Sequence, residues 1–379
     1  MKIGAKNSGS VRLRQDGLWE ARAIINGKRR SFYAEKQGDA LKAMRAAQKA
    51  EDDGVYFEPT KLTVERWLHT WLDEYISQSA KPLTLSTYRN RTDVHIIPAL
   101  GKIKLSDLNA TQIQVFYNNL SREGKLSPKT VKNIHGILHK ALEQAVKLRY
   151  IAYNAADACE LPRVEKHEIQ PLTEEQIAAF LAEIKNGEPL RDLFTVTLFT
   201  GMREGEVCGL AWDAVDFNSG TIAIRQQLQK QKEKGGDYYI ATTKSGKTRI
   251  LTPAPFIMDI LKRIFREQKL AQLQAGSAWD NQWNLVFVDA IGHHIIPQTV
   301  LKHFKAICSR IGRPDARFHD LRHTYAVVSL QEGDDVKTVQ ENLGHATASF
   351  TLDVYGHVSE KMKQDSAERM QKYREKFNA

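Results

Sequence analysis

Short alternating runs of apolar and polar residues mark the first fifty positions. They predict three strands and then a helix, over residues 11–15, 18–25, 28–33 and 36–52. Asp16-Gly17 and Asn26-Gly27 are turn sequences, and the second is a strong signal for a two-residue hairpin. Ala40, Met44 and Ala47 then recur at helical spacing. We therefore expect a small three-stranded sheet followed by one helix.

In residues 61–160, the apolar residues recur at helical spacing. Residues 54–60 contain Gly and Pro and show no periodicity, so we expect a linker there. Four helices are predicted to begin at Thr63, Thr84, Thr111 and Ser127. Threonine and serine are preferred N-cap residues, and Pro128 suits the first helical position. We expect the second helix to run to about Ile97 and to be ended by Pro98 and Gly101, because proline and glycine interrupt helices.

The remainder of the chain mixes helical and strand patterns. Thr173-Glu-Glu-Gln176 is a capping box, which opens a helix. Residues 221–228 and 238–251 predict strands of a small sheet. The fold class that we expect is multidomain. Its parts are a small three-stranded β-sheet plus helix at 1–55, an all-α domain at 61–160 and a mixed α/β, mainly α, domain at 171–379.

Positive charge is concentrated at the N-terminal end. The chain has a formal net charge of +10, and residues 1–50 hold 12 basic and 4 acidic residues, a difference of +8. A basic module on a nearly neutral body favours nucleic acid as a partner over the alternative, a merely solvated surface. A sheet that presents basic side chains can enter a DNA groove. The candidate DNA contacts are Arg14, Arg22, Lys28 and Arg30.

Several other classes of protein are disfavoured. No apolar run approaches the roughly 20 residues needed to span a bilayer, and residues 1–10 lack the apolar centre of a secretory signal. We therefore expect a cytoplasmic protein without a membrane partner. Cys159, Cys208 and Cys308 are far apart and form no CxxC pair, which argues against disulfides and a structural zinc site. His293-His294 has no partner at metal-ligand spacing, so no metal is expected.

Four short segments of the C-terminal half collect the polar residues that carry chemistry. They are Thr200-Gly-Met-Arg203-Glu-Gly-Glu206, Thr243-Lys244-Ser-Gly-Lys-Thr-Arg249, His319-Asp-Leu-Arg322-His-Thr-Tyr325, and Leu343-Gly-His345 followed ten residues later by Tyr355. The second segment lies between two apolar strand patterns. We expect it to be a hairpin turn between Tyr239 and Ile250.

These segments resemble the tyrosine recombinase (phage integrase) family in residue type, order and spacing. The family pattern is an Arg in G-x-R-x-x-E, a Lys in a β-hairpin, H-x-x-R, L-G-H and a Tyr nine or ten residues later. Each part alone is weak, but all five in order across about 150 residues are highly specific. The resemblance implies an N-terminal arm-site-binding domain, as in phage and conjugative-transposon integrases. It also implies that residues 61–160 are the helical core-binding domain and 171–379 the catalytic domain.

The resemblance implies DNA cleavage through a covalent intermediate. Tyr355 would be the nucleophile, leaving a 3′-phosphotyrosine and a free 5′ hydroxyl. The covalent bond conserves energy, so another DNA end can reverse the step without ATP. Lys244 would protonate the departing 5′ oxygen, and His319 would assist proton transfer at Tyr355.

Two guanidinium groups would stabilise charge on the phosphate. Arg203 and Arg322 suit bidentate contact with phosphate oxygens, and His345 would add a hydrogen bond. Preorganised donors of this kind usually supply the largest catalytic term. With these groups present, no metal or other cofactor is required. We expect Glu206 to support the first arginine and His323 to be structural.

Neighbouring residues compete for two of these roles. Lys247 and Arg249 are rivals of Lys244, but the position of Lys244 directly before a small-residue turn favours it. Tyr325 is the rival phenol to Tyr355. It precedes an apolar stretch, so we expect it to be a core residue.

The function that the resemblance implies is a site-specific recombinase that integrates and excises a mobile element. Its partners would be double-stranded DNA attachment sites, a homotetramer formed on DNA, an excisionase and a host DNA-bending protein. The alternatives are a chromosome-dimer-resolving recombinase, a type IB topoisomerase-like enzyme and a DNA-binding factor without catalysis. The basic N-terminal module argues against the first two. The complete catalytic set argues against the third.

The end of the chain predicts one apolar helical stripe. Its members are Val358, Met362, Met370, Tyr373 and Phe377. In the family, the equivalent tail often docks on a neighbouring subunit, which would couple the active sites. The alternative is a cap within the same chain, and the sequence leaves both open.

Overall fold

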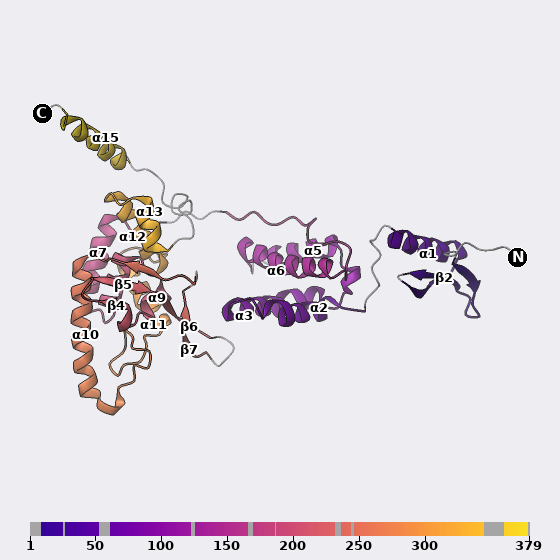
Figure 1. Cartoon of the computed structure of the whole chain (residues 1–379), viewed down its shortest axis with the longest axis horizontal. Helices are drawn as coiled ribbons and strands as arrows, with labels where there is room; N and C mark the ends of the chain where they lie inside the picture. The colour runs from indigo at the N-terminus through magenta and orange to yellow at the C-terminus, as the bar shows by residue number, and fades with distance from the viewer. Residues whose placement is uncertain are drawn as a thin grey trace. The chain divides into compact units, whose positions relative to one another are not determined.

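Two compact units make up the chain, Met1–Lys166 and His167–Ala379 (Figure 1). The computed structural model describes residues 9–25, 27–52, 61–122, 126–165, 170–185, 187–231, 236–243, 246–344 and 360–377. In the first unit, buried apolar residues form two separate clusters, one before and one after residue 60. The proposed linker at 54–60 lies outside the described residues. Nowhere in the described ranges is a helix long and apolar enough to cross a membrane.

The N-terminal module is a three-stranded antiparallel sheet with one helix. Strands β1 (Ser10–Leu13), β2 (Trp19–Ile25) and β3 (Lys28–Ala34) pair in that order, and α1 (Gln37–Asp52) follows. Ile25 pairs with Lys28, which confirms the two-residue hairpin. The module has a small core of its own, formed by Ala21, Ala23, Ile25, Ala40 and Met44.

The helical part of the first unit forms a second core. Its elements are α2 (Val64–Thr70), η1 (Trp71–Ile76), α3 (Pro82–Arg91), η2 (Thr92–Ile96), α4 (Ile97–Leu100), η3 (Leu105–Asp107), α5 (Ala110–Arg122) and α6 (Pro128–Lys147). Trp67 is buried at its centre and donates a 2.8 Å hydrogen bond from Nε1 to the carbonyl of Ala141. The indole thereby buries its large ring and still satisfies its only polar group.

Three helix boundaries in this part differ from the prediction. The second helix begins at Pro82, with Lys81 as its N-cap, and not at Thr84. Pro98 does not end the second helix but lies inside α4. A π-helical turn, η2, precedes α4, so Pro98 falls in the first turn of a new helix, where its missing N–H costs little. Asn109, not Thr111, caps α5, because its Oδ1 accepts from the Gln112 N–H and the Gln112 side chain accepts from the Asn109 N–H.

The predicted caps Thr63, Ser127 and Thr173 are confirmed. The Oγ1 of Thr63 accepts from the Arg66 N–H and that of Ser127 from the Thr130 N–H, at the starts of α2 and α6. In the second unit, Thr173 and Gln176 exchange the two hydrogen bonds of a capping box. The helix that they open is α7 (Glu174–Lys185).

The second unit is mainly helical and contains short strands. Its further helices are α8 (Arg191–Thr200), α9 (Glu204–Cys208), η4 (Trp212–Ala214), α10 (Pro255–Ala275), η5 (Gly276–Ala278), α11 (Pro297–Arg310), α12 (His319–Gln331), α13 (Val336–Leu343) and α15 (Glu360–Glu375). Its strands are β4 (Val215–Asp216), β5 (Thr221–Ile224), β6 (Gln226–Lys230), β7 (Tyr238–Thr242) and β8 (Arg249–Leu251). Aromatic rings of α7, α8 and α11 meet in the core, among them Phe180, Phe194 and Phe304.

The predicted hairpin turn around Lys244 is wrong in its geometry. Strand β7 pairs with β6, whereas β8 pairs with β5. Thr242 lies opposite Gln226 and Arg249 lies opposite Ile224, so a single residue, Arg225, separates the two pairings on the preceding segment. The sequence pattern marks two strands with turn residues between them, but it does not reveal that both pair with the same preceding segment.

Glycines bring α9 directly onto the backbone of β6. A Cβ at Gly209 would lie 2.5 Å from the backbone nitrogen of Leu228, and one at Gly205 would lie 2.9 Å from its carbonyl oxygen. Both distances are too short for any side chain. This packing fixes α9, which carries the first of the candidate catalytic segments, against the sheet.

Gly209→Ala is expected to destabilise the second unit by about 1–3 kcal/mol, because the added methyl group overlaps backbone that cannot rotate away. Gly136→Ala is the matched control. Gly136 lies within α6 with no atom within 4 Å of its Cβ position, so alanine there should stabilise the first unit by up to about 1 kcal/mol. Hydrogen exchange read separately for the two units tests both, and unchanged protection in Gly209→Ala would contradict the packing argument.

Candidate active site

Arg203 stands where helix α8 gives way to α9. Helix α8 ends at Gly201, which has a left-handed backbone with φ of 63°. A Cβ at Gly201 would lie 2.6 Å from Leu343 Cδ2 and from Tyr325 Cδ1, so the close approach of these two side chains also requires glycine. The chain then turns, and Arg203 becomes the N-cap of α9. The first glycine of the G-x-R-x-x-E motif thus sets the position of its arginine.

The buried carboxylate of Glu206 holds Arg203 in place. It accepts hydrogen bonds from the Arg203 backbone nitrogen at 2.9 Å and from Arg203 Nη1 at 2.7 Å. Arg249 donates to the two oxygens from Nη1 at 3.0 Å and Nη2 at 2.6 Å. Burial alone would raise the pKa of Glu206, but the hydrogen bonds and charges of Arg249 and Arg203 outweigh it and lower the pKa to about 2. The expected support of Arg203 by Glu206 is confirmed.

Arg322 is buried at the centre of the same site. Its side chain projects from α12 and is 1% exposed. Nη1 donates to the carbonyl of Gly201 at 2.8 Å, and Nη2 donates to the carbonyl of Leu343. Arg322 therefore ties the end of α8 to the end of α13, two segments more than 140 residues apart. Its contact with a phosphate remains a prediction.

Helix α13 brings the fourth segment to the site. It lies beside α12 (Figure 1) and also packs on β8. Gly344 ends it with a left-handed φ of 64°, as the L-G-H pattern requires, and His345 follows directly. His345, Lys244 and Tyr355 all lie outside the described residues.

His319 is the first residue of α12 and lies near both arginines. Its side chain is exposed at the surface. Partial desolvation and the charges of Arg322 and Arg203 lower the pKa of His319 to about 4. The buried ring of His323 meets it edge-on at 4.7 Å, and burial and His319 likewise lower the pKa of His323 to about 4. At neutral pH, His319 is thus an uncharged imidazole that can accept a proton.

Tyr325 has the structural role that its apolar surroundings predict. Its ring packs with Leu343 on Gly201 and belongs to the apolar cluster between α12 and α13. Its hydroxyl accepts a 3.1 Å hydrogen bond from Asn342 Nδ2. A phenol held in this way is a packing residue, which confirms the prediction.

The basic residues of the N-terminal sheet divide between its two faces. The strand register puts Arg22 on the face away from the buried alanines, beside Arg12 and Arg29. Arg12 and Arg22 both pair with the buried Glu20, and the hydrogen bond from Arg22 is the main cause that lowers the pKa of Glu20. Arg12 and Arg29 are not among the predicted DNA contacts, and only the strand register places them on this face.

The other three proposed DNA contacts have different surroundings. Arg14 pairs with Asp16 at 3.0 Å and lies over the ring of Tyr33. Arg30 and Lys28 pair in register with Ala23 and Ile25, so they belong to the core side of the sheet, where Arg30 is half-buried and Lys28 exposed. The register therefore does not place all four proposed contacts on one face. Whether each contacts DNA stays a prediction.

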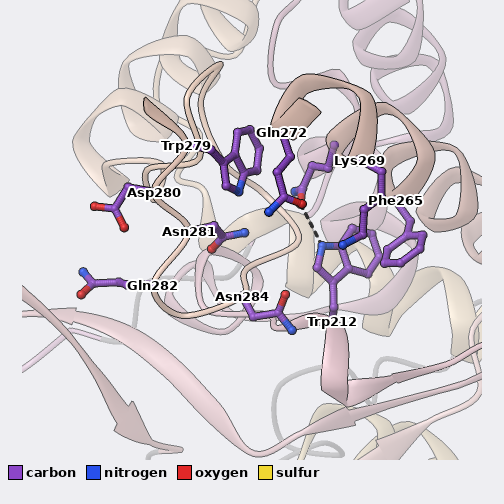
Figure 2. A pocket seen from close by; sticks show the side chains of 10 residues that line it. Trp212, Phe265, Lys269, Gln272, Trp279, Asp280, Asn281, Gln282 and Asn284 are labelled. Atoms are coloured by element: carbon purple, nitrogen blue, oxygen red, sulfur yellow. Dashed lines mark hydrogen bonds between the residues drawn. The ribbon is translucent and has the colours of Figure 1, made fainter. Parts of the chain in front are cut away.

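A separate surface pocket lies between α10 and the segment 279–284 (Figure 2). Trp212, Phe265 and Trp279 give it apolar walls. Gln268 accepts a hydrogen bond from Trp212 Nε1 and donates to the carbonyl of Val286, so these polar groups are used within the fold. Arg203, His319 and Arg322 do not line this pocket.

Sequence comparison places these features in a known family. The sequence profile described as "Phage integrase family" matches residues 170–362, a little over half of the chain. The chain belongs to the phage integrase family of tyrosine recombinases. It is a site-specific recombinase, an enzyme that cuts and rejoins DNA. A second profile, "Phage integrase, N-terminal SAM-like domain", matches residues 63–121.

Relatives of the recombinase match from about three quarters to nine tenths of its length. "Tyrosine recombinase XerC-like" of Caldanaerobacter subterraneus subsp. tengcongensis is 31% identical over 363 residues, covering 90% of this chain and 92% of the relative. The "ICEBs1 integrase" of Bacillus subtilis is 23% identical and covers 77% of this chain and 78% of its own length.

Solved structures share the fold. The Tn1549 transposon integrase in complex with a circular intermediate DNA has a TM-score of 0.68 at 20% identity, covering 82% of this chain and 100% of that chain. A lambda integrase dimer bound to a core site has a TM-score of 0.57 at 19% identity, covering 94% and 97%. At this level of identity the likeness concerns the fold alone.

In an NMR titration of the free recombinase, His319 is expected to titrate near pH 4. Arg203→Ala should raise this midpoint, because the positive charge of Arg203 disfavours the imidazolium. Arg310→Ala is the control, since Arg310 pairs with Glu183 on α7. A wild-type midpoint near 6.5 would contradict the proposed environment.

The stability of the recombinase should fall as the pH falls from about 6.5 to about 4. In this interval the unfolded chain binds protons at His319 and His323, whereas the folded chain binds them only near pH 4.

Proposed function

We propose that the recombinase integrates and excises a mobile element by cutting and rejoining attachment-site DNA through a 3′-phosphotyrosine at Tyr355. The observation that carries the proposal is the meeting of three motif residues, Arg203, His319 and Arg322, from segments more than 100 residues apart. Several relatives are named integrases, including that of Staphylococcus phage L54a and the Bacillus subtilis protein above. These names support an integrase over the chromosome-dimer-resolving and topoisomerase-like alternatives.

Each described residue fits one part of this reaction. Arg203 keeps part of its side chain accessible, 26%, so it is suited to contact a non-bridging phosphate oxygen. Arg322 supplies a second positive charge, which is buried. The neutral imidazole of His319 is suited to take the proton of an attacking tyrosine.

The other three residues continue described segments. Lys244 follows Thr243, whose buried side chain donates to the carbonyl of Lys247 and so closes the loop. His345 follows Gly344 at the end of α13. We assign to Lys244 the protonation of the leaving oxygen, to His345 a hydrogen bond to the phosphate and to Tyr355 the nucleophilic attack.

The reaction exchanges one phosphodiester for another. The phenolate oxygen of Tyr355 attacks phosphorus, the bond from phosphorus to the 5′ oxygen breaks, and a proton from Lys244 neutralises that oxygen. In the reverse direction, a 5′ hydroxyl from a second DNA end attacks the phosphotyrosine and releases the phenol. Two cationic guanidinium groups stabilise the charge that develops on the phosphate in both steps. The cycle requires neither a metal nor a cofactor.

We extend the proposal to the assembly on DNA. The three parts predicted at 1–55, 61–160 and 171–379 would bind arm sites, bind the core site and cleave it. The lambda integrase, which shares the fold, has been solved as a tetramer bound to a Holliday junction, and we propose a homotetramer for this recombinase. An excisionase and a host DNA-bending protein would set the direction of the reaction.

Tyr355→Phe should bind a nicked attachment-site substrate with unchanged affinity but form no covalent adduct, because it lacks the attacking oxygen. Wild-type protein should accumulate the adduct, since the nick lets the 5′ end diffuse away. Denaturing gel electrophoresis of labelled DNA measures this. Tyr325→Phe is the matched control and should keep the ability to form the adduct. An adduct in Tyr355→Phe would refute the nucleophile assignment.

Arg29→Ala should weaken arm-site binding and reduce the slope of log affinity against log salt by about 1, as expected when one phosphate contact is lost. Arg29 lies on the same face as Arg12 and Arg22 and is exposed. Lys42→Ala, an exposed position on α1, should change affinity and slope much less. Filter binding at several salt concentrations measures both. Equal losses of affinity in the two variants would show that the sheet face carrying Arg12, Arg22 and Arg29 is not the DNA-binding face.

A further inference from the structure

Arg249 makes contacts that link three parts of the catalytic unit. It begins strand β8, which pairs with β5. Its guanidinium binds both oxygens of Glu206 on α9, and its Nε donates to the carbonyl of Asn342 on α13 at 2.8 Å. The side chain is only 10% exposed. One arginine therefore connects the sheet, the helix capped by Arg203 and the helix that leads to Gly344.

The packing around this guanidinium is closely fitted. A Cβ at Gly344 would lie 3.0 Å from Arg249 Cδ and 3.4 Å from its Nη1. The glycine at the end of α13 thus meets two requirements, a left-handed backbone and room for Arg249. Any shift of Arg249 would be transmitted to α13 through the Asn342 carbonyl and this contact.

Charge explains why a second arginine is needed. Glu206 is 1% exposed, and if it were paired with Arg203 alone, the two side chains would have no net charge. With Arg249 present, the three side chains together carry one positive charge. Arg249 binds the carboxylate through two of its nitrogens, so the charge of Arg203 is not cancelled by its own support. A phosphate would then meet a site with surplus positive charge.

We propose that Arg249 is a positioning residue of the recombination reaction, which neutralises Glu206 and thereby orients Arg203 and preserves its charge for the phosphate. This inference rests on the proposed role of Arg203 in cleavage. Arg249 does not itself contact the DNA in this proposal. It acts through Glu206 and through the backbone of α13.

The test measures single-turnover cleavage of the nicked substrate at saturating protein, so that the rate reports chemistry and not binding. Arg249→Met keeps the length of the side chain without its charge and should slow cleavage by about 10²-fold, the cost of a misplaced catalytic group. DNA affinity should change by less than about threefold, since this residue makes no phosphate contact. Arg263→Met is the matched control. Arg263, on α10, also pairs with two carboxylates, Asp192 and Glu267, but neither of them is Glu206. It should cleave at the wild-type rate.

A double variant separates charge from mere stability. Glu206→Gln with Arg249→Met removes both buried charges and leaves Arg203 with its own, so cleavage should recover to within about tenfold of wild type. It also leaves no unpaired buried carboxylate, so it remains informative where Arg249→Met alone does not fold. A double variant that cleaves no faster than Arg249→Met, or as poorly as Arg203→Ala, would overturn the charge argument.

Arg203→Ala in the same assay separates this inference from the proposed function. If Arg203→Ala cleaves at the wild-type rate, the proposed catalytic role of Arg203 is wrong. If Arg203→Ala is inactive and Arg249→Met cleaves like the wild type, only the role of Arg249 is wrong. Loss of cleavage in both, with recovery in the double variant, supports both.

Discussion

The carboxylate of Glu206 is buried and accepts hydrogen bonds from the backbone and side chain of Arg203 and from the guanidinium of Arg249. A buried carboxylate without such partners would be strongly destabilising, so its presence requires that the surrounding segments stay where they are. The start of α9, the first residue of β8 and, through Arg249, the end of α13 are therefore fixed together. In the described part of the second unit, this ion cluster holds these three segments together.

Arg322 is a second buried charged group that is satisfied by hydrogen bonds to its neighbours. Its guanidinium is almost fully buried and bonds to the last carbonyls of α8 and α13, at the glycine-terminated ends of both helices. Buried cations and buried carbonyl groups each cost free energy unless they are paired, and here they satisfy one another. Desolvation, together with the positive charges of Arg322 and Arg203, lowers the pKa of the nearby His319 to about 4. In the proposed reaction, the side chains that support the structure would therefore also stabilise charge on the phosphate.

The N-terminal sheet and the helical part that follows it have separate hydrophobic cores. The N-terminal sheet has a small core of its own, and the helical part that follows has a larger one built around Trp67. Separate cores permit separate tasks, since neither needs the other in order to bury its apolar residues. The basic side chains of the sheet are distributed by the period-two alternation of its strands, which puts Arg12, Arg22 and Arg29 on one face.

The sequence by itself determined the family, the order of the motifs and most helix starts, because these depend on local signals such as caps, glycines and spacing. Thr63, Ser127 and the capping box at Thr173 are examples. Only the tertiary structure revealed that β7 and β8 pair with the same preceding segment, and that Arg249, a rival for the catalytic lysine in sequence terms, is a buried partner of Glu206. Those facts depend on contacts between residues more than 40 positions apart or on the pairing of strands, and no local pattern encodes them.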